Sequence, residues 1–464
     1  MIPLGREEED MASVDLAERI HNHNFRLDPY VRSLLDTDFY KLLMAAYIWK
    51  WHPDVHVKFA VKNRSAAKAL LADAISIKDL KAQLDHVKGL RFSEAELIWL
   101  QGNTFYGQRG IFSGEFVDAL RNLRLCDYRI SIGADGDYEI EFEGTWFECT
   151  LWEIYVLSIL NEARSRAGMS DMSKYQLRVL YANGLSKLVD KMKRLKAANV
   201  PGIAEFGTRR RHGFLWQEQA IEAMQEELGA NFIGTSNALH AMRRGLPAIG
   251  TNAHELPMVE AALARAKAIE EGHMGERELF RSQYDVLRKW QQTYGGNLLV
   301  ALPDTFGSTQ FLKHALEEFP EIRKWTGFRE DSKDPFVAGE EKIAFWENIG
   351  CDPRDRLQLF SDGLDVDQMI ALHDRFRGRI REGYGWGTLA TNDFRGCDPR
   401  GGDALDPISV VCKVSAVKRG RNAPWISAVK LSDNFTKATG SETEVEFYRG
   451  VFGTEGVENA PVIV

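Results

Sequence analysis

Residues 357–388 read LQLFSDGLDVDQMIALHDRFRGRIREGYGWGT, and this stretch contains a strand–helix–strand pattern. The apolar run 357–360 is followed by a polar turn and an amphipathic stretch, which Asp365 and Gln368 open as N-cap and capping-box residues. A second short run near Ile380 leads into a glycine-rich segment. Because two parallel strands need a crossover connection, the pattern predicts a parallel βαβ unit.

The same unit recurs from about residue 200 to residue 390. The predicted strands are Ile203–Phe206, Asn231–Ile233, Ala248–Gly250, Leu298–Leu302, Leu357–Phe360 and a run from Ile380. The predicted helices between them are Phe214–Leu228, a short helix that ends at Arg244, an Ala- and Glu-rich helix after His254, and a helix from Ser308. Such a series favours either a barrel or a doubly wound sheet. Both folds build their active sites at the carboxyl ends of the strands.

The flanking segments have a different pattern. Between residues 20 and 150, helices are mixed with strand-like runs such as Val55–Val61 and Tyr138–Phe142. Beyond residue 405, three runs have the character of antiparallel strands: Ile408–Val417, Trp425–Leu431 and Glu444–Phe452.

The composition is that of an ordinary globular protein, with 464 residues, of which 44% are hydrophobic and 27% charged. A net charge of −8 argues against a dedicated nucleic-acid binder. The five cysteines are scattered without a C-x-x-C pair, which fits a reducing compartment rather than a disulfide framework or a zinc site. The longest apolar run, Leu42–Trp49, is too short to span a bilayer. We therefore expect a cytoplasmic protein that binds neither nucleic acid nor membrane.

Glycine-bearing turns on two late, neighbouring strands predict a phosphate site. Gly383, Gly385 and Gly387 would let backbone N–H groups close around an anion. The preceding strand ends in Ser361-Asp362-Gly363. Neighbouring late strands of a barrel commonly supply its phosphate site.

Charged residues follow other predicted strands on the same rim. Arg209 stands nearest to its strand end within 209–211, where a guanidinium could bind a phosphate or a carboxylate. Arg329 and Asp331 follow a further short β-like run. Solvated loops often have the same composition, so both interpretations remain open.

His254 lies in the loop Thr251-Asn252-Ala253-His254-Glu255, directly after a predicted strand. A histidine there could be a general base, a ligand or a phosphorylated nucleophile, and the residues alone do not choose among these roles. Tyr40 precedes an apolar helix, where it could equally be a core aromatic.

Seven segments together resemble the nicotinate phosphoribosyltransferase family, a type II phosphoribosyltransferase family. They are LLDTDFYKLLM (34–44), EFGTRRR (205–211), FIGTSNALHAMRRGLPAIGTNAHE (232–255), LPDTFGSTQFL (302–312), FSDGLDVDQMI (360–370), GYGWGTLATNDF (383–394) and VKLSDNFTKATG (429–440). These segments run in the family's order across nearly the whole chain. The resemblance implies an irregular α/β barrel at 151–404 and a second, mixed α+β domain formed from 20–150 and 405–464. We expect residues 1–19 to be a disordered extension.

The resemblance also implies the reaction. Nicotinate and phosphoribosyl diphosphate would give nicotinate mononucleotide and diphosphate in NAD salvage, coupled to hydrolysis of ATP with Mg²⁺ as cofactor, which places the enzyme among the ligases. His254 would be the residue that ATP phosphorylates. The protein would be a homodimer with shared active sites, in which Phe206 and Tyr40 of the other subunit enclose the pyridine ring.

Further roles carry over from the same resemblance. Arg209, Arg329 and Asp331 would hold the ring substrate and the ribose diphosphate, and Asp331 is a candidate contact for Mg²⁺. Ser236 would favour a carboxylate over an amide. Asp362 and the glycines at 383, 385 and 387 would hold the ribose and its 5′-phosphate. The remaining candidate substrate contacts are Thr208, Asp304, Gly363 and Thr388.

One departure and three alternatives accompany this interpretation. The family usually has R-x-D-S-G-D where this chain has 329–334, so Lys333 replaces a glycine and puts the loop conformation in question. A related enzyme for nicotinamide is disfavoured because amide-using relatives tend to have an acid at the position of Ser236. A quinolinate enzyme would lack the phosphorylated histidine. A non-catalytic nucleotide-binding barrel is disfavoured by the many arginines and acids on the rim.

Overall fold

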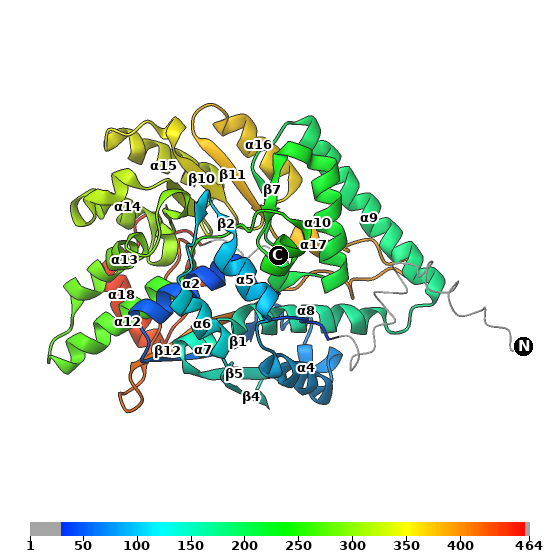
Figure 1. The fold of residues 1–464 in the computed structure, drawn as a ribbon, viewed down its shortest axis with the longest axis horizontal. Coiled ribbons are helices and arrows are strands. Elements are labelled where there is room, and N and C mark those ends of the chain that lie inside the picture. Colours follow the sequence, from blue (N-terminus) through cyan, green and yellow to red (C-terminus); the bar gives the residue numbers. More distant parts are fainter. Residues whose placement is uncertain (1–28, 460–464) are drawn as a thin grey trace, which may run out of the picture.

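The computed structural model describes residues 29–459, so the predicted extension at 1–19 lies outside the described part. A six-stranded sheet forms the larger half of the molecule, in the order β7-β6-β11-β10-β9-β8 (Figure 1). Every neighbouring pair in it is parallel. The strands are β6 (Ile203–Glu205), β7 (Phe232–Thr235), β8 (Val300–Ala301), β9 (Gly327–Glu330), β10 (Leu357–Phe360) and β11 (Arg381–Trp386).

Helices alternate with these strands, as the sequence pattern predicts. They are α9 (Lys174–Ala197), α10 (Phe214–Leu228), α11 (Ala238–Arg244), α12 (Glu255–Glu270), α13 (Glu276–Gln291), α14 (Ser308–Glu318), α15 (Pro335–Asn348), α16 (Val366–Phe376) and α17 (Thr388–Thr391). The N-cap of α16 is confirmed, because the Asp365 side chain accepts a hydrogen bond from the backbone N–H of Gln368.

A second sheet joins the two ends of the chain. Its order is β13-β12-β1-β5-β4, and its pairs are antiparallel. The strands are β1 (Val55–Asn63), β4 (Asp127–Ile132), β5 (Tyr138–Thr145), β12 (Val410–Arg419) and β13 (Ile426–Ser427). Because β1 pairs along its length with β12, the N-terminal and C-terminal segments form one layer, which lies below the parallel sheet in Figure 1. The predicted fold class is confirmed.

The N-terminal half of the chain supplies further elements around the second sheet. Its helices are α2 (Phe39–Trp51), α3 (Leu71–Ala74), α4 (Ile77–Gly89), α5 (Glu94–Gly102), α6 (Gly114–Asn122), α7 (Trp146–Cys149) and α8 (Trp152–Met169), and a small hairpin is formed by β2 (Thr104–Phe105) and β3 (Gln108–Arg109). Helix α2 is buried along most of its length, because its apolar residues are not confined to one stripe.

Three predicted strands need correction. Residues Glu444–Phe452 form most of helix α18 (Glu442–Phe452), whose buried Tyr448 and Phe452 lie four positions apart on one helical face. Of Trp425–Leu431, only the two residues of β13 are a strand. Ala248–Gly250 is reduced to a single parallel bridge between Ala248 and Thr235, since the chain turns away at once into the His254 loop.

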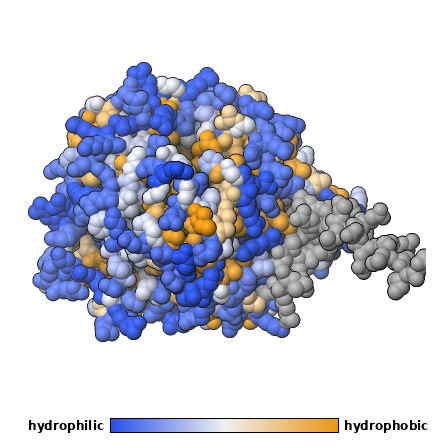
Figure 2. Space-filling model, in the orientation of Figure 1, coloured by the Kyte–Doolittle hydropathy of each residue, from blue (hydrophilic) through white to orange (hydrophobic). Residues whose placement is uncertain are grey.

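The registers place several loops at one edge of the parallel sheet. Glu330 at the end of β9 lies beside Phe360 at the end of β10, and Phe360 lies beside Tyr384 in β11. The turns that follow β9 and β10 therefore emerge next to the glycine-rich end of β11. The face seen in Figure 2 is mostly hydrophilic, with apolar side chains in small separate groups. Within residues 29–459, no helix is long and apolar enough to cross a membrane.

Candidate active site

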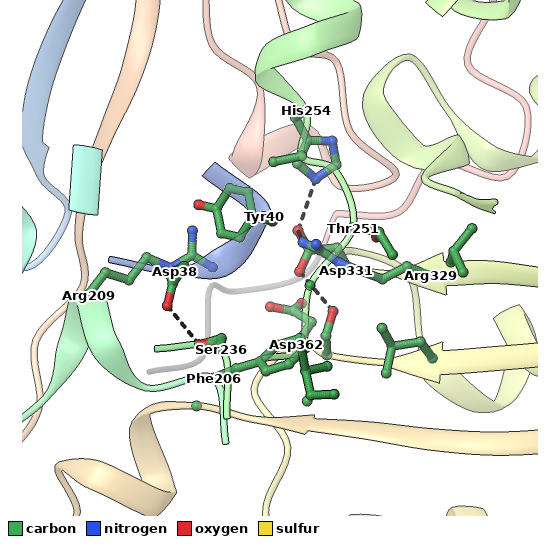
Figure 3. A pocket seen from close by; sticks show the side chains of 18 of the residues that line it. Asp38, Tyr40, Phe206, Arg209, Ser236, Thr251, His254, Arg329, Asp331 and Asp362 are labelled. Atoms are coloured by element: carbon green, nitrogen blue, oxygen red, sulfur yellow. Dashed lines mark hydrogen bonds and ion pairs between the residues drawn. The ribbon is translucent and has the colours of Figure 1, made fainter. Parts of the chain in front are cut away.

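A cavity of about 510 Å³ opens at the carboxyl edge of the parallel sheet and continues along its inner face as far as Leu357 and Arg381. Most of the predicted site residues line it (Figure 3). They are Tyr40, Phe206, Arg209, Ser236, His254, Arg329, Asp331, Asp362, Gly363, Gly383, Gly385, Gly387 and Thr388. Segments far apart in the sequence therefore meet around one space.

Two predicted contacts, Thr208 and Asp304, do not line the cavity. Both side chains are fully buried. Thr208 Oγ1 accepts a hydrogen bond from Gln217 Nε2 at 3.0 Å. Asp304 accepts one from Ser332 Oγ at 2.7 Å and lies behind His254. These two residues therefore lie behind the side chains that line the cavity.

His254 directly precedes helix α12, and its ring is held on both sides. Nδ1 lies 3.0 Å from Thr305 Oγ1, and Nε2 lies 2.9 Å from Asp331 Oδ2 and 3.0 Å from Lys430 Nζ. Burial lowers the pKa of His254 to about 4, and the attraction of Asp304 only partly opposes this. The imidazole is therefore neutral at physiological pH.

Asp331 connects the histidine to a cation. Arg329 donates to Asp331 Oδ2 at 3.2 Å and to the backbone carbonyl of Asn252 at 3.1 Å. Burial by itself would raise the pKa of Asp331, but Arg329 and His254 hold it well below its usual range. The site thus has an ionised carboxylate beside a neutral imidazole.

The two predicted ring-binding aromatics lie in the same cavity of one chain. Phe206 follows β6, and Tyr40 is in the first turn of α2. Gly385 on β11 leaves room for Phe206, because a Cβ at this glycine would come within 2.5 Å of the ring. Figure 3 shows both rings directed into the space between the strand ends and α2.

The start of α2 is fixed to the barrel by contacts within the chain. Phe39 N donates to the carbonyl of Ser236 at 2.6 Å. Arg211 binds the buried Asp36 with both terminal nitrogens, at 2.7 and 2.9 Å. Tyr40 therefore lines the cavity of its own chain, and the expected contribution of Tyr40 from another subunit stays a prediction.

Arg209 and Ser236 lie at the end of the cavity that is expected to bind the pyridine ring, which is called the ring end below. Arg209 donates to Glu153 Oε1 at 3.3 Å, and about a third of its side chain is exposed. Ser236 Oγ donates to Asp38 Oδ1 at 2.7 Å. Burial raises the pKa of Asp38, although Arg209 opposes the shift. Asp38 received no role in the sequence analysis.

The loop after β9 accommodates Lys333 without strain. The backbone N–H groups of Asp331, Ser332 and Lys333 all donate to Glu330 Oε1, at 3.2, 3.1 and 2.9 Å. Lys333 does not adopt a positive φ. Its ammonium points away from the cavity and donates to Thr309 Oγ1 and Glu341 Oε2, both at 2.9 Å. No feature of this loop requires the glycine that is usual in the family.

Several cations in the cavity wall were not predicted. They are Arg64, Arg210, Arg381, Lys413, Lys430 and Lys437. Lys437 pairs with Asp362. Lys413 lies on β12, and burial together with the nearby Lys430 lowers its pKa well below the usual range. The family-like segment 429–440 was the signal that could have marked Lys430 and Lys437 as site residues.

A parallel sheet whose carboxyl edge carries glycine turns and many cations is typical of proteins that bind phosphorylated small molecules. The family comparison is more specific. The model of the nicotinate phosphoribosyltransferase family matches residues 202–455, and the model of its N-terminal domain matches residues 35–161. The chain belongs to this family.

Solved structures with a similar fold carry the same name. Nicotinate phosphoribosyltransferase from Porphyromonas gingivalis is 25% identical, with a TM-score of 0.77, over 91% of this chain and 100% of its own. A putative nicotinate phosphoribosyltransferase from Saccharomyces cerevisiae is 26% identical, with a TM-score of 0.76 and coverages of 92% and 99%. The Vibrio cholerae enzyme is 27% identical, with a TM-score of 0.76 and coverages of 93% and 96%.

Proposed function

We propose that this protein transfers the phosphoribosyl group of phosphoribosyl diphosphate to nicotinate, with ATP hydrolysis coupled to the transfer. Family membership and the paired aromatics in one cationic cavity support the proposal. The observation that carries it is the joint placement of Tyr40, Phe206 and Arg209 around the same space.

The ring end suits a flat anion. Tyr40 and Phe206 would hold the pyridine ring by stacking, which also orients its nitrogen for attack. Arg209 would bind the carboxylate. The Ser236 hydroxyl donates to Asp38, and burial raises the pKa of Asp38, which favours the uncharged form of that acid beside an incoming carboxylate.

The phosphoribosyl end suits the sugar phosphate and the leaving group. The glycines at 383, 385 and 387 would allow close approach of the 5′-phosphate, and Thr388 would donate to it. Gly363 and the Asp362 carboxylate would face the ribose hydroxyls. In the reaction the pyridine nitrogen bonds to the anomeric carbon while the bond from that carbon to the diphosphate oxygen breaks. Arg329 and Lys430 would neutralise the charge that develops on the diphosphate.

The donor set fits Mg²⁺, which prefers carboxylate and phosphate oxygens. Asp331 and Asp362 present carboxylates to the cavity, and the buried Asp304 Oδ1 has no hydrogen-bond partner within the described residues. Bound together with the diphosphate, the ion would lower the charge on the leaving group. The chain's own contribution is to hold these carboxylates in place, through Arg329 for Asp331 and Lys437 for Asp362.

His254 is suited to accept a phosphoryl group. Its neutral imidazole has Nδ1 beside the Thr305 hydroxyl, and Nε2 beside the Asp331 carboxylate and the Lys430 ammonium. Nε2 would become the nucleophile in the tautomer that carries its proton on Nδ1, with Asp331 turned toward Mg²⁺ and away from the ring. Nε2 would bond to the γ-phosphorus of ATP as the bond to the ADP oxygen breaks, and ADP would leave. Hydrolysis of the P–N bond by water would then release phosphate and restore the imidazole. Lys430 would stabilise the negative charge during both steps.

A product assay with nicotinate, nicotinamide and quinolinate, each with and without ATP, tests the proposal. We expect a mononucleotide from nicotinate only, and more of it with ATP. With γ-labelled ATP, the wild type should take up acid-labile phosphate. His254→Ala should take up none and lose the ATP stimulation while retaining a basal transfer. Absence of product from nicotinate in the wild type would reject the transfer reaction, and absence of label would reject the phosphohistidine.

A further inference from the structure

A buried ammonium joins two carboxylates behind the wall of the cavity. Lys41 on α2 is completely buried and does not line the cavity itself. Its Nζ lies 2.6 Å from Glu153 Oε2 and also pairs with Glu255 Oε2. Both carboxylates line the cavity. The mechanism described above makes no use of this three-charge bridge.

The first arm of the bridge leads to the ring end. Glu153 is in the first turn of α8. Its Oε1 accepts a hydrogen bond from Arg209, and its Oε2 accepts one from the Tyr40 hydroxyl at 3.4 Å. Glu153 therefore orients Arg209 and Tyr40, which are the two groups expected to hold nicotinate. Burial would raise its pKa, but Lys41 and Arg209 lower it, so the carboxylate stays ionised.

The second arm leads to the histidine. Glu255 is the first residue of α12 and follows His254 directly. Its Oε1 accepts hydrogen bonds from Trp146 Nε1 at 2.6 Å and from Thr150 Oγ1 at 2.8 Å, while its Oε2 faces Lys41. With both oxygens engaged, the Glu255 side chain ties the beginning of α12, and hence the His254 ring, to α2.

Lys41 keeps its charge in this environment. Burial would lower its pKa, but the two carboxylates raise it above the usual value. Because one buried ammonium serves both carboxylates, a change in the position or pairing of one carboxylate alters the attraction of the ammonium for the other. The two arms are therefore energetically linked.

We propose that Lys41 is a positioning residue that couples occupancy of the ring end to the state of His254. The proposal rests on the ATP-coupled function proposed above. When the nicotinate carboxylate draws Arg209 away from Glu153, that glutamate gains attraction for Lys41, and the Lys41–Glu255 contact weakens. Relaxation of Glu255 then shifts the beginning of α12 and the ring of His254. By reciprocity, phosphorylation of His254 changes the affinity for nicotinate through the same bridge.

The test measures the ratio of the nicotinate KM values without and with ATP. Couplings of this kind typically amount to roughly 5- to 150-fold. In Lys41→Met, which keeps an apolar stem of similar length, we expect the ratio to fall to about one while His254 still takes up phosphate. Lys289→Met is the matched control, because Lys289 pairs with another buried acid of α12, Glu260, at 2.7 and 2.8 Å, away from the cavity. The control should lose stability and keep the wild-type ratio.

Two variants, each of which alters only one of the two carboxylates bound to Lys41, keep the proposal testable if Lys41→Met does not fold. Glu255→Gln leaves the Lys41–Glu153 pair intact, so it should abolish the ATP effect while leaving the KM without ATP within about twofold of the wild type. Glu153→Gln should instead raise the KM without ATP. A folded, phosphorylated Lys41→Met or Glu255→Gln protein with the wild-type ratio overturns the proposal. A wild type without any ATP effect overturns the ATP-coupled function itself, and this is measured before any variant is made.

Discussion

At the scale of single residues, the chemistry of His254 depends on neighbours that are distant in the sequence. Thr305, Asp331 and Lys430 contact its ring from three other segments. The local pattern predicts His254 on the rim, and the structure agrees, although the strand expected before it is only a single bridge. It could not choose between a base, a ligand and a nucleophile, because burial and the contacts of each ring nitrogen are tertiary properties.

The low pKa of His254 predicts the direction in which the stability of the fold changes with pH. The imidazole has a pKa of about 4 when folded and an ordinary value of 6.5 when exposed, because burial disfavours the cation. The unfolded chain therefore takes up the proton first as the pH falls. The contribution of His254 to stability is fully present above about pH 6.5 and is lost progressively toward pH 4.

As the pH falls from 7 to 5, the free energy of unfolding should therefore decrease less in His254→Asn than in the wild type. The difference between the two decreases should reach up to about 2 kcal/mol. Urea unfolding at the two pH values measures the difference. In the wild type, an NMR titration should place the His254 midpoint below pH 5. A midpoint near 6.5 would contradict the burial argument and would remove the reason for a neutral nucleophile at physiological pH.

At the scale of elements, the strand–helix units of the barrel were predictable because each is encoded locally. Turn residues and helix caps such as Asp365 mark where each unit begins and ends. The C-terminal run 444–452 was assigned to a strand wrongly, since its alternating residues also fit one face of a helix. Packing of Tyr448 and Phe452 against Phe306 decides for the helix.

The loop after β9 shows how an unusual residue is accommodated. Lys333 has an ordinary negative φ, its N–H donates to Glu330, and its ammonium binds Thr309 and Glu341 on neighbouring helices. We expect Lys333→Gly to lower the free energy of unfolding by about 2 kcal/mol, through added freedom of the unfolded chain and the lost ion pair. Because the side chain points away from the cavity, the nicotinate KM should stay within about twofold.

Denaturant unfolding and steady-state kinetics of the same preparation check both parts of this prediction. Lys333→Met separates the charge from the backbone effect, since it keeps the side-chain stem and the ordinary φ. A glycine variant as stable as the wild type would mean that the ammonium contacts contribute nothing. A large rise in KM would instead show that this loop controls the orientation of Arg329.

At the scale of the whole molecule, the site depends on how the two ends of the chain come together. Pairing of β1 with β12 brings Lys413 to the cavity wall, and the segment after β12 supplies Lys430 and Lys437. Lys413 has no local signal, because its position depends on a contact between strands about 350 residues apart. Lys430 and Lys437 are marked only by the family-like segment 429–440. The strand–helix units of the parallel sheet and its rim were therefore predictable from the sequence, and the cations contributed by the C-terminal segment were not.

The same arrangement makes a prediction about shared active sites. Tyr40, Phe206 and His254 line one cavity of one chain, and the beginning of α2 is held there by the Asp36–Arg211 pair. A dimer whose sites exchange Tyr40 would recover activity when Tyr40→Ala and His254→Ala proteins are mixed, because one of its two sites would be intact. We expect no recovery here, since Tyr40 and His254 of the same chain line one cavity. The measurement is the ATP-stimulated transfer rate of the mixture after joint unfolding and refolding, compared with the sum of the separate proteins. Wild type refolded in the same way controls for recovery of the fold, and a rate near one quarter of that control would establish exchanged sites instead.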